Sequence, residues 1–191
     1  YEEAAAQGLI ARINAHRSVR GLTSIILGRD QAYIGVLIDD LTTLGTSEPY
    51  RMFTSRAEHR LLLREANAEK RLTSIGREIG LVKDPQWHAF QARTKLELDV
   101  VDLLEGTHLY QNEECNRKLS DLGFAPIRKK TSLAQLLSRP QVHLDDLGPF
   151  VESDLLRELG HRASEEIETQ TKFYGYIKRG EDLAQRLSRA D

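Results

Sequence analysis

The sequence has one cysteine, one methionine and no long apolar run, and each shortage narrows what the protein can be. A single cysteine, Cys115, cannot form an internal disulfide, which fits a reducing compartment. Without a run of about 18 apolar residues, we expect no transmembrane helix. Hydrophobic residues make up 40% and charged residues 29% of the 191 residues, with a net charge of −2. We therefore expect a cytoplasmic globular protein in which any anion-binding site is local.

Short motifs of nucleotide, metal and redox sites are also missing. The sequence contains no G-x-G-x-x-G, no G-x-x-x-x-G-K-[ST], no H-E-x-x-H and no C-x-x-C. Its six histidines are scattered singly. Asp39 and Asp40 are adjacent, but neighbouring helical residues point about 100° apart, so we expect their carboxylates not to share a site. The residues alone therefore assign no catalytic group and no metal ligand.

Apolar residues recur mostly at helical spacing, which predicts a mainly α protein with one or two short strands. After Asp30, an expected N-cap, apolar residues repeat at i, i+3, i+4 and i+7 until Gly45, which indicates a helix. Gly35 costs this helix up to ~1 kcal/mol relative to alanine, so we expect it to serve close packing. The predicted helices cover residues 1–19, 31–44, 68–79, 84–104, 112–122, 133–139, 153–159 and 165–189.

The segment EPYRMFTSRAEHRLLLR, residues 48–64, places four arginines among aromatic and aliphatic side chains. We call it the arginine segment. A guanidinium group suits phosphate or carboxylate and stacks on rings, which favours an anion-binding site. A solvated face paired with neighbouring glutamates would give the same composition. For residues 60–64 we favour a short strand over a helix. The four arginines are Arg51, Arg56, Arg60 and Arg64.

A second cluster near the end of the sequence mixes cations with aromatic residues and contains no acid. Such a mixture suits a polynucleotide, through phosphate contacts and base stacking. A helix with Tyr174 and Ile177 packed inward and its lysines outward explains the cluster equally well. Its members are Lys172, Phe173, Tyr174, Tyr176, Lys178 and Arg179.

Several long strings closely resemble the MnmG/GidA family, the large subunit of the tRNA uridine 5-carboxymethylaminomethyl modification enzyme. They are YEEAAAQGL, QAYIGVLIDDL, EPYRMFTSRAE, RLT-x-IGRE-x-GLV and KFYGYIKR. The resemblance implies a homodimeric FAD enzyme that uses NADH and methylenetetrahydrofolate. It also implies a heterotetramer with the MnmE GTPase that modifies C5 of the wobble uridine in tRNA. Arg12 and His59 depart from the family, which usually has Gly and Tyr there.

The resemblance also implies a role for each part of the chain. Residues 1–22 would end an FAD-binding α/β domain, residues 23–82 would form a junction with the arginine segment, and residues 83–191 would form an incomplete helical C-terminal domain. Because the first residue is Tyr1 and the only methionine is Met52, we expect a fragment that is inactive alone.

Site residues follow from the matching strings. Two hypotheses stay open for the arginines: tRNA contact, or a structural junction in which Asp39, Asp40 or Glu58 pairs with them. An alternative for the whole chain is a helical module for dimerisation or partner docking without RNA contact. The resemblance implies FAD contacts at Gln7, Glu3 and Gly8, and tRNA contacts at Arg51, Arg56, Arg60, Arg64, Lys172, Tyr176, Lys178 and Arg179.

Overall fold

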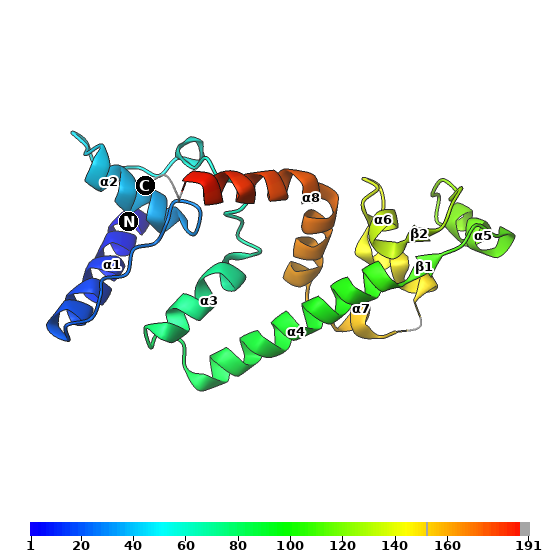
Figure 1. Ribbon diagram of the computed structural model, residues 1–191, viewed down its shortest axis with the longest axis horizontal. Helices are drawn as coiled ribbons and strands as arrows, with labels where there is room; N and C mark the ends of the chain where they lie inside the picture. The colour runs from blue at the N-terminus through cyan, green and yellow to red at the C-terminus, as the bar shows by residue number, and fades with distance from the viewer. Residues whose placement is uncertain (152, 188–191) are drawn as a thin grey trace. The chain divides into compact units, whose positions relative to one another are not determined.

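A computed structural model describes residues 1–151 and 153–187 and confirms a mainly helical protein with one small sheet (Figure 1). The chain divides into two compact units. The first unit contains residues 1–75 together with the chain from Lys178 onward, and the second contains residues 76–177. The three-part division at residues 22 and 82 stays a prediction. Within the described residues, no helix is both long and apolar enough to cross a membrane.

The first unit is built around two helices that pack together, α1 (Glu2–Val19) and α2 (Tyr33–Thr43) (Figure 1). The expected N-cap of α2 is wrong: the position is Ala32, because the turn before it closes through Gly28, whose carbonyl accepts from Ala32 N at 3.2 Å. The remaining elements of this part are η1 (Thr54–Arg56) and α3 (Ala68–Glu78), which runs past the boundary of the unit.

Gly35 lies where α2 crosses the loop that precedes it. A Cβ atom at this position would lie 2.2 Å from the carbonyl oxygen of Gly28 and 2.5 Å from that of Leu27. No real Cβ contact is that short, so only glycine lets the helix approach the loop backbone. The expectation that Gly35 serves close packing is confirmed.

Residues 60–64 form a turn, and the favoured strand is wrong. The backbone N–H groups of Leu62 and Leu63 both donate to the carbonyl of His59, at 2.9 and 3.0 Å. Side chains satisfy the carbonyls that a strand ladder would use: Asn67 Nδ2 donates to Leu62 O at 3.0 Å, and Arg71 Nη2 donates to Arg64 O at 3.0 Å. Leu63 is buried in a small apolar cluster of this unit, so burial and side-chain hydrogen bonds select the turn.

The second unit surrounds a core of aliphatic side chains. Its sheet pairs His108 with Ser132 and Leu109 with Thr131 in antiparallel register. Ser132 also caps the following helix by accepting from Gln135 N at 3.1 Å. The elements are α4 (Asp84–Gly106), β1 (His108–Leu109), α5 (Glu113–Asp121), β2 (Thr131–Ser132), α6 (Leu133–Leu137), η2 (Leu144–Phe150), α7 (Leu155–Glu158) and α8 (His161–Leu187).

Helix α8 begins at His161, four residues before the predicted start at 165, and continues into the first unit. Its backbone leaves the helical region at Phe173, where φ is −108° and ψ is 15°. The later part of the helix packs within the first unit: a Cβ at Gly180 would lie 3.7 Å from the side chain of Leu62. This part of α8 therefore packs against the arginine segment, and the space at Gly180 would also accommodate a Cβ atom.

Candidate functional site

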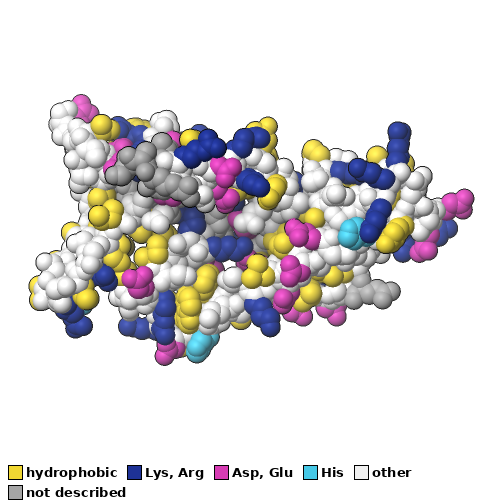
Figure 2. Space-filling model, viewed as in Figure 1, with side chains coloured by type: hydrophobic (Ala, Val, Ile, Leu, Met, Phe, Trp, Pro, Cys, Tyr) yellow, Lys and Arg dark blue, Asp and Glu magenta, His cyan; other side chains and the backbone are white. Residues whose placement is uncertain are grey.

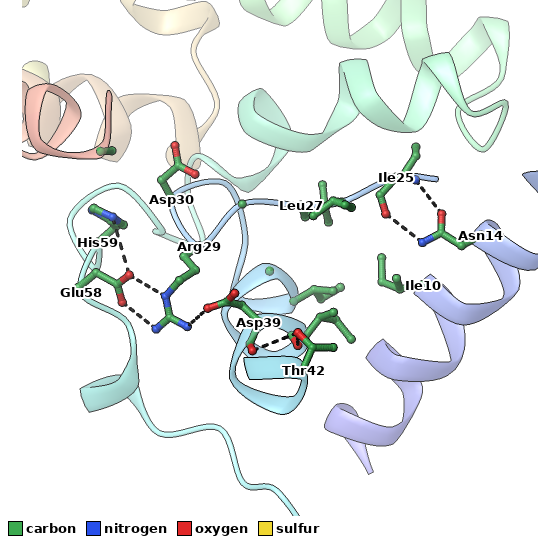
Figure 3. Close-up of a pocket in the computed structure, with 16 residues that line it drawn as sticks. Ile10, Asn14, Ile25, Leu27, Arg29, Asp30, Asp39, Thr42, Glu58 and His59 are labelled. Carbon is green, nitrogen blue, oxygen red and sulfur yellow. Dashed lines mark hydrogen bonds and ion pairs between the residues drawn. The ribbon is translucent and has the colours of Figure 1, made fainter. Parts of the chain in front are cut away.

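The guanidinium group of Arg29 is the centre of an ion-pair network in the first unit (Figure 3). It holds Glu58 with two hydrogen bonds, from Nε at 2.7 Å and from Nη2 at 3.0 Å. Nη1 donates to Asp39 at 2.8 Å and to Asp40 at 2.6 Å, and Nη2 donates to the carbonyl of Arg56 at 3.0 Å. We call Asp39, Asp40 and Glu58 the carboxylate cluster. The network connects α2 to the arginine segment.

Asp39 and Asp40 therefore share a site, contrary to the expectation from helical geometry. Their side chains do leave α2 in different directions, but the two N–H groups of Nη1 in Arg29 reach one carboxylate each. A planar group with several donors spans an angle that a point charge would not. Sequence reasoning missed Arg29, because it lies in a loop where no periodicity predicts a partner.

Asp40 also joins the network to the aromatic face of the arginine segment. It is only 4% exposed, and the Tyr50 hydroxyl donates to its second oxygen at 2.6 Å. The Arg56 guanidinium lies 3.6 Å from the same oxygen and 4.9 Å from the centre of the Tyr50 ring. Arg56 is thus held by one ion pair and one cation–π contact, each worth on the order of 1 kcal/mol at a partly exposed site.

The network shifts the pKa values of Glu58, Asp40 and Tyr50. Hydrogen bonds from Arg29 outweigh burial and lower the pKa of Glu58. Burial raises the pKa of Asp40, but hydrogen bonds from Tyr50 and Arg29 outweigh it, so the net pKa is lowered. Burial and the hydrogen bond to Asp40 raise the pKa of Tyr50 to about 12. At neutral pH Glu58 and Asp40 are charged and Tyr50 is a hydrogen-bond donor.

A pocket of about 460 Å³ adjoins this network within the first unit (Figure 3). One wall is closed by paired hydrogen bonds between the Asn14 amide and the backbone of Ile25, at 2.7 and 2.9 Å. His59, where the resemblance leads us to expect tyrosine, also lines the pocket and is buried, with Nε2 3.9 Å from Glu58. The histidine ring therefore lies beside the Glu58 side chain on the buried side of the network.

The four predicted arginines divide into two kinds of environment. Arg51 and Arg60 are exposed, and the Arg51 guanidinium lies 6.0 Å from the centre of the Phe53 ring. Arg56 is 43% exposed but paired with Asp40, and Arg64 is partly buried and donates to the Leu61 carbonyl. Arg51 and Arg60 are therefore positioned to contact a ligand from solvent. Arg56 and Arg64 contribute at least in part to the structure of the segment.

The predicted flavin contacts lie on α1 and face different surroundings. Gln7 and Gly8 are exposed. Glu3 accepts a hydrogen bond from Met52 N at 3.1 Å, and this bond lowers the pKa of Glu3. The structure therefore separates Glu3, which anchors the arginine segment to α1, from Gln7 and Gly8. Arg12, the other departure from the family, is exposed on the same helix and needs no buried space.

The predicted tRNA contacts of α8 belong to both units. Lys178 and Arg179 are exposed in the first unit, which also contains the arginine segment. In the second unit, Tyr176 is 61% exposed. Lys172 is only 16% exposed, and its ammonium group lies 3.1 Å from Glu168. On the face shown in Figure 2, basic and acidic side chains are interspersed, which agrees with a net charge of −2.

Comparisons with known proteins add an independent observation. Residues 84–181 match the family described as the tRNA modifying enzyme MnmG/GidA C-terminal helical domain. Over 191 residues the chain is 45% identical to the tRNA uridine 5-carboxymethylaminomethyl modification enzyme MnmG of Syntrophotalea carbinolica, and 44% identical to that of Lactococcus lactis. The chain belongs to the MnmG/GidA family. The resemblance carried by the sequence strings is thereby confirmed.

The chain spans 30% of the length of these two MnmG relatives, although the matches cover all of it. Its structure is similar to two crystal forms of GidA from Aquifex aeolicus. Form II has a TM-score of 0.79 at 34% identity, with 99% of this chain and 29% of that chain covered. Form I has a TM-score of 0.78 at 36% identity, with 99% and 28% covered. In this chain, the family's C-terminal helical domain covers α4 to α7 and most of α8.

Proposed function

We propose that this chain is part of a flavin-dependent enzyme that adds a carboxymethylaminomethyl or aminomethyl group to C5 of the wobble uridine in tRNA. One observation carries the proposal: relatives whose names state this modification are 45% and 44% identical over the whole chain. Since the chain corresponds to 30% of those relatives, the remaining parts of the enzyme would supply the catalytic groups. A homodimer, an MnmE-type GTPase partner, NADH and methylenetetrahydrofolate belong to the same proposal.

Gln7 and Gly8 fit the edge of a flavin site. A Cβ at Gly8 would meet no atom within 4 Å, so a cofactor can approach the backbone closely there. The exposed Gln7 amide offers both a donor and an acceptor. Bound FAD would supply the redox chemistry, while these two residues would bind and orient it. Glu3 would act indirectly, by fixing Met52 and the arginine segment against α1.

Arg51 and Arg60 are the best candidates for direct tRNA contact. Both are exposed arginines, and a guanidinium group binds phosphate with charge-assisted hydrogen bonds. Lys178 and Arg179 add positive charge within the same unit. The interface would act by electrostatic attraction and positioning, because phosphate contacts carry no sequence information.

A reconstitution experiment tests the proposed activity. The full-length protein that contains this chain is mixed with an MnmE-type GTPase, GTP, tRNA, FAD, NADH, methylenetetrahydrofolate and glycine or ammonium as the nitrogen source, and wobble uridine is analysed by mass spectrometry. We expect modified uridine with the full-length protein and none with the chain alone. Failure of the full-length protein to modify tRNA would contradict the proposed reaction, and modification by the chain alone would contradict its dependence on other domains.

A specific observation favours a second role for the arginine segment, as a structural junction. Arg56 is bound to Asp40 and Tyr50, and its carbonyl accepts from Arg29. Breaking a partly buried ion pair by removing one partner leaves the other charge uncompensated, which destabilises the fold. The two roles are separated by measuring unfolding free energy and tRNA affinity on the same variants: a structural arginine changes the first, and an RNA contact changes the second.

A further inference from the structure

Arg29 uses its complete hydrogen-bonding capacity inside the protein. A guanidinium group has five N–H donors, and those of Arg29 reach Glu58 twice, Asp39, Asp40 and the carbonyl of Arg56. Its side chain is 29% exposed. No donor is left for a ligand, so Arg29 itself cannot be an anion contact in this geometry.

Arg56 differs from Arg29 in what its own contacts leave available. Its guanidinium lies 3.6 Å from Asp40, rests on the Tyr50 ring and is 43% exposed. An arginine stacked on an aromatic ring keeps its in-plane N–H groups open to a further acceptor. Arg56 is thus placed at the edge of the carboxylate cluster without being enclosed by it.

The charges explain why Arg56 can stay at that edge. Two guanidinium groups, Arg29 and Arg56, face three carboxylates, Asp39, Asp40 and Glu58. Arg29 contacts all three, at 2.6 to 2.8 Å. Without it, three negative charges would face Arg56 as the one remaining guanidinium of the network, and attraction at close range in a partly buried site would draw that group inward.

We propose that Arg29 is a positioning residue: it neutralises the carboxylate cluster and holds the Arg56 backbone, which keeps the Arg56 guanidinium available to a tRNA phosphate. This inference rests on the proposed function, since it assumes that tRNA is the anionic ligand. It assigns a role in RNA binding to a residue that does not touch the RNA. It also explains how one network can be a structural junction and an RNA-binding element at once.

A double-mutant cycle in the full-length protein tests this coupling. The variants are Arg29→Met, Arg56→Met and the double variant, with tRNA affinity measured over a range of salt concentrations. We expect Arg29→Met to weaken binding as much as Arg56→Met, on the order of tenfold, and to lower the salt slope by about 0.7–0.9, the value of one phosphate contact. The double variant should be no weaker than either single variant, because Arg29 acts through Arg56.

A rescue variant and a matched control separate positioning from loss of folding. Arg29→Met combined with Glu58→Gln removes one competing carboxylate and should restore part of the affinity. Arg117→Met removes an exposed arginine from α5 and should leave the salt slope unchanged. Circular dichroism verifies that each variant is folded, and Arg29→Gln, which removes the charge but keeps a polar side chain, replaces Arg29→Met with the same expected losses if Arg29→Met does not fold.

Each outcome is decisive. Unchanged affinity in Arg29→Met, additive losses in the double variant, or no rescue by Glu58→Gln would overturn the positioning role. Unchanged affinity in Arg56→Met would overturn it as well, while leaving the proposed function intact if Arg51 and Arg60 variants lose binding. Absence of tRNA binding by the wild-type protein would instead contradict the proposed function itself.

Discussion

Arg29 donates two parallel hydrogen bonds, at 2.7 and 3.0 Å, to Glu58, which lies 29 residues later in the sequence. This bidentate pair joins the loop before α2 to the arginine segment, and Asp40 extends it to Tyr50 and Arg56. The arginine segment is therefore held in place by a residue outside it. We propose that the stability of this segment and its contacts with tRNA depend on the same few charges.

Acid should weaken the first unit through its carboxylates. The pKa values of Glu58 and Asp40 are lowered in the folded protein. A carboxyl with a lowered folded pKa contributes stability above its unfolded pKa, and this contribution is lost as the pH falls through the folded pKa. We expect the free energy of unfolding to fall below about pH 4, the unfolded pKa range of carboxyl groups.

Denaturant unfolding at several pH values measures this effect. The variant Glu58→Gln should be less stable at neutral pH and should depend less on pH in the acid range. Glu105→Gln, an exposed carboxylate on α4, is the matched control and should follow the wild type. An identical pH dependence in wild type and Glu58→Gln would contradict the importance of the pair with Arg29.

Ionisation of Tyr50 should destabilise the same network at alkaline pH. Its pKa is raised to about 12, so the neutral hydroxyl is favoured in the folded protein. That stability is present below the unfolded pKa near ~10 and is lost as pH rises toward the folded value. The variant Tyr50→Phe leaves Asp40 without this donor and should cost about 1–3 kcal/mol.

Spectrophotometric titration of the tyrosines checks the assignment. The sequence has six tyrosines, and the wild type should show a component that titrates near pH 12. Tyr50→Phe should remove that component, whereas Tyr110→Phe, an exposed tyrosine of the second unit, should leave it in place. Loss of the component in Tyr110→Phe, or its persistence in Tyr50→Phe, would show that the raised pKa belongs elsewhere.

The close approach at Gly35 makes a large loss of stability the expected result of adding a methyl group. In Gly35→Ala the new Cβ would overlap the carbonyl oxygens of Gly28 and Leu27, and backbone cannot move aside as a flexible side chain can. Overpacking of this kind costs about 1–3 kcal/mol or more. Gly106→Ala at the end of α4 meets nothing within 4 Å and is the matched control. Equal melting temperatures for the two variants would contradict the packing argument.

Part of the fold could be predicted from the sequence. Helical periodicity located most of the helices, and the cost of glycine in a helix correctly marked Gly35 as a packing position. The prediction of a strand at residues 60–64 was wrong. The side chains of Asn67 and Arg71 donate to backbone carbonyls that a neighbouring strand would otherwise pair with.

The ion-pair network could not be predicted from the sequence, for a different reason. Its centre, Arg29, lies 10 and 29 residues from its partners Asp39 and Glu58, in a loop without periodicity. Only the fold brings these charges together. The pairing of Arg56 with Asp40 and the partial burial of Arg64, which distinguish these two from Arg51 and Arg60, also depend on that fold.

Lys172 offers a case in which geometry and family resemblance lead to different expectations. The resemblance implies tRNA contact, but its ammonium group lies 3.1 Å from Glu168 and 3.5 Å from the Pro140 carbonyl. Glu168 also accepts from Leu144 N at 2.8 Å, so Lys172 compensates a carboxylate that connects α8 to η2. We expect Lys172→Met to cost about 1–3 kcal/mol of stability and to leave the salt slope of tRNA binding unchanged.

Chemical denaturation and tRNA titration of Lys172→Met together give the answer. The control Lys95→Met removes an exposed lysine of α4 and should change neither quantity. If Lys172→Met keeps wild-type stability and lowers the salt slope by about 0.7–0.9, Lys172 contacts a phosphate, and the structural role is wrong.

We propose above all that the exposed arginines of the arginine segment, Arg51 and Arg60, bind tRNA. The most direct test is the salt dependence of tRNA affinity for the full-length protein with Arg51→Gln and Arg60→Gln combined, compared with Arg117→Gln. We expect the double variant to remain folded and to bind tRNA more weakly. The magnitude of the slope of log K against log salt should fall by about 1.4–1.8, the value of two phosphate contacts. An unchanged slope and affinity in the folded double variant would contradict it.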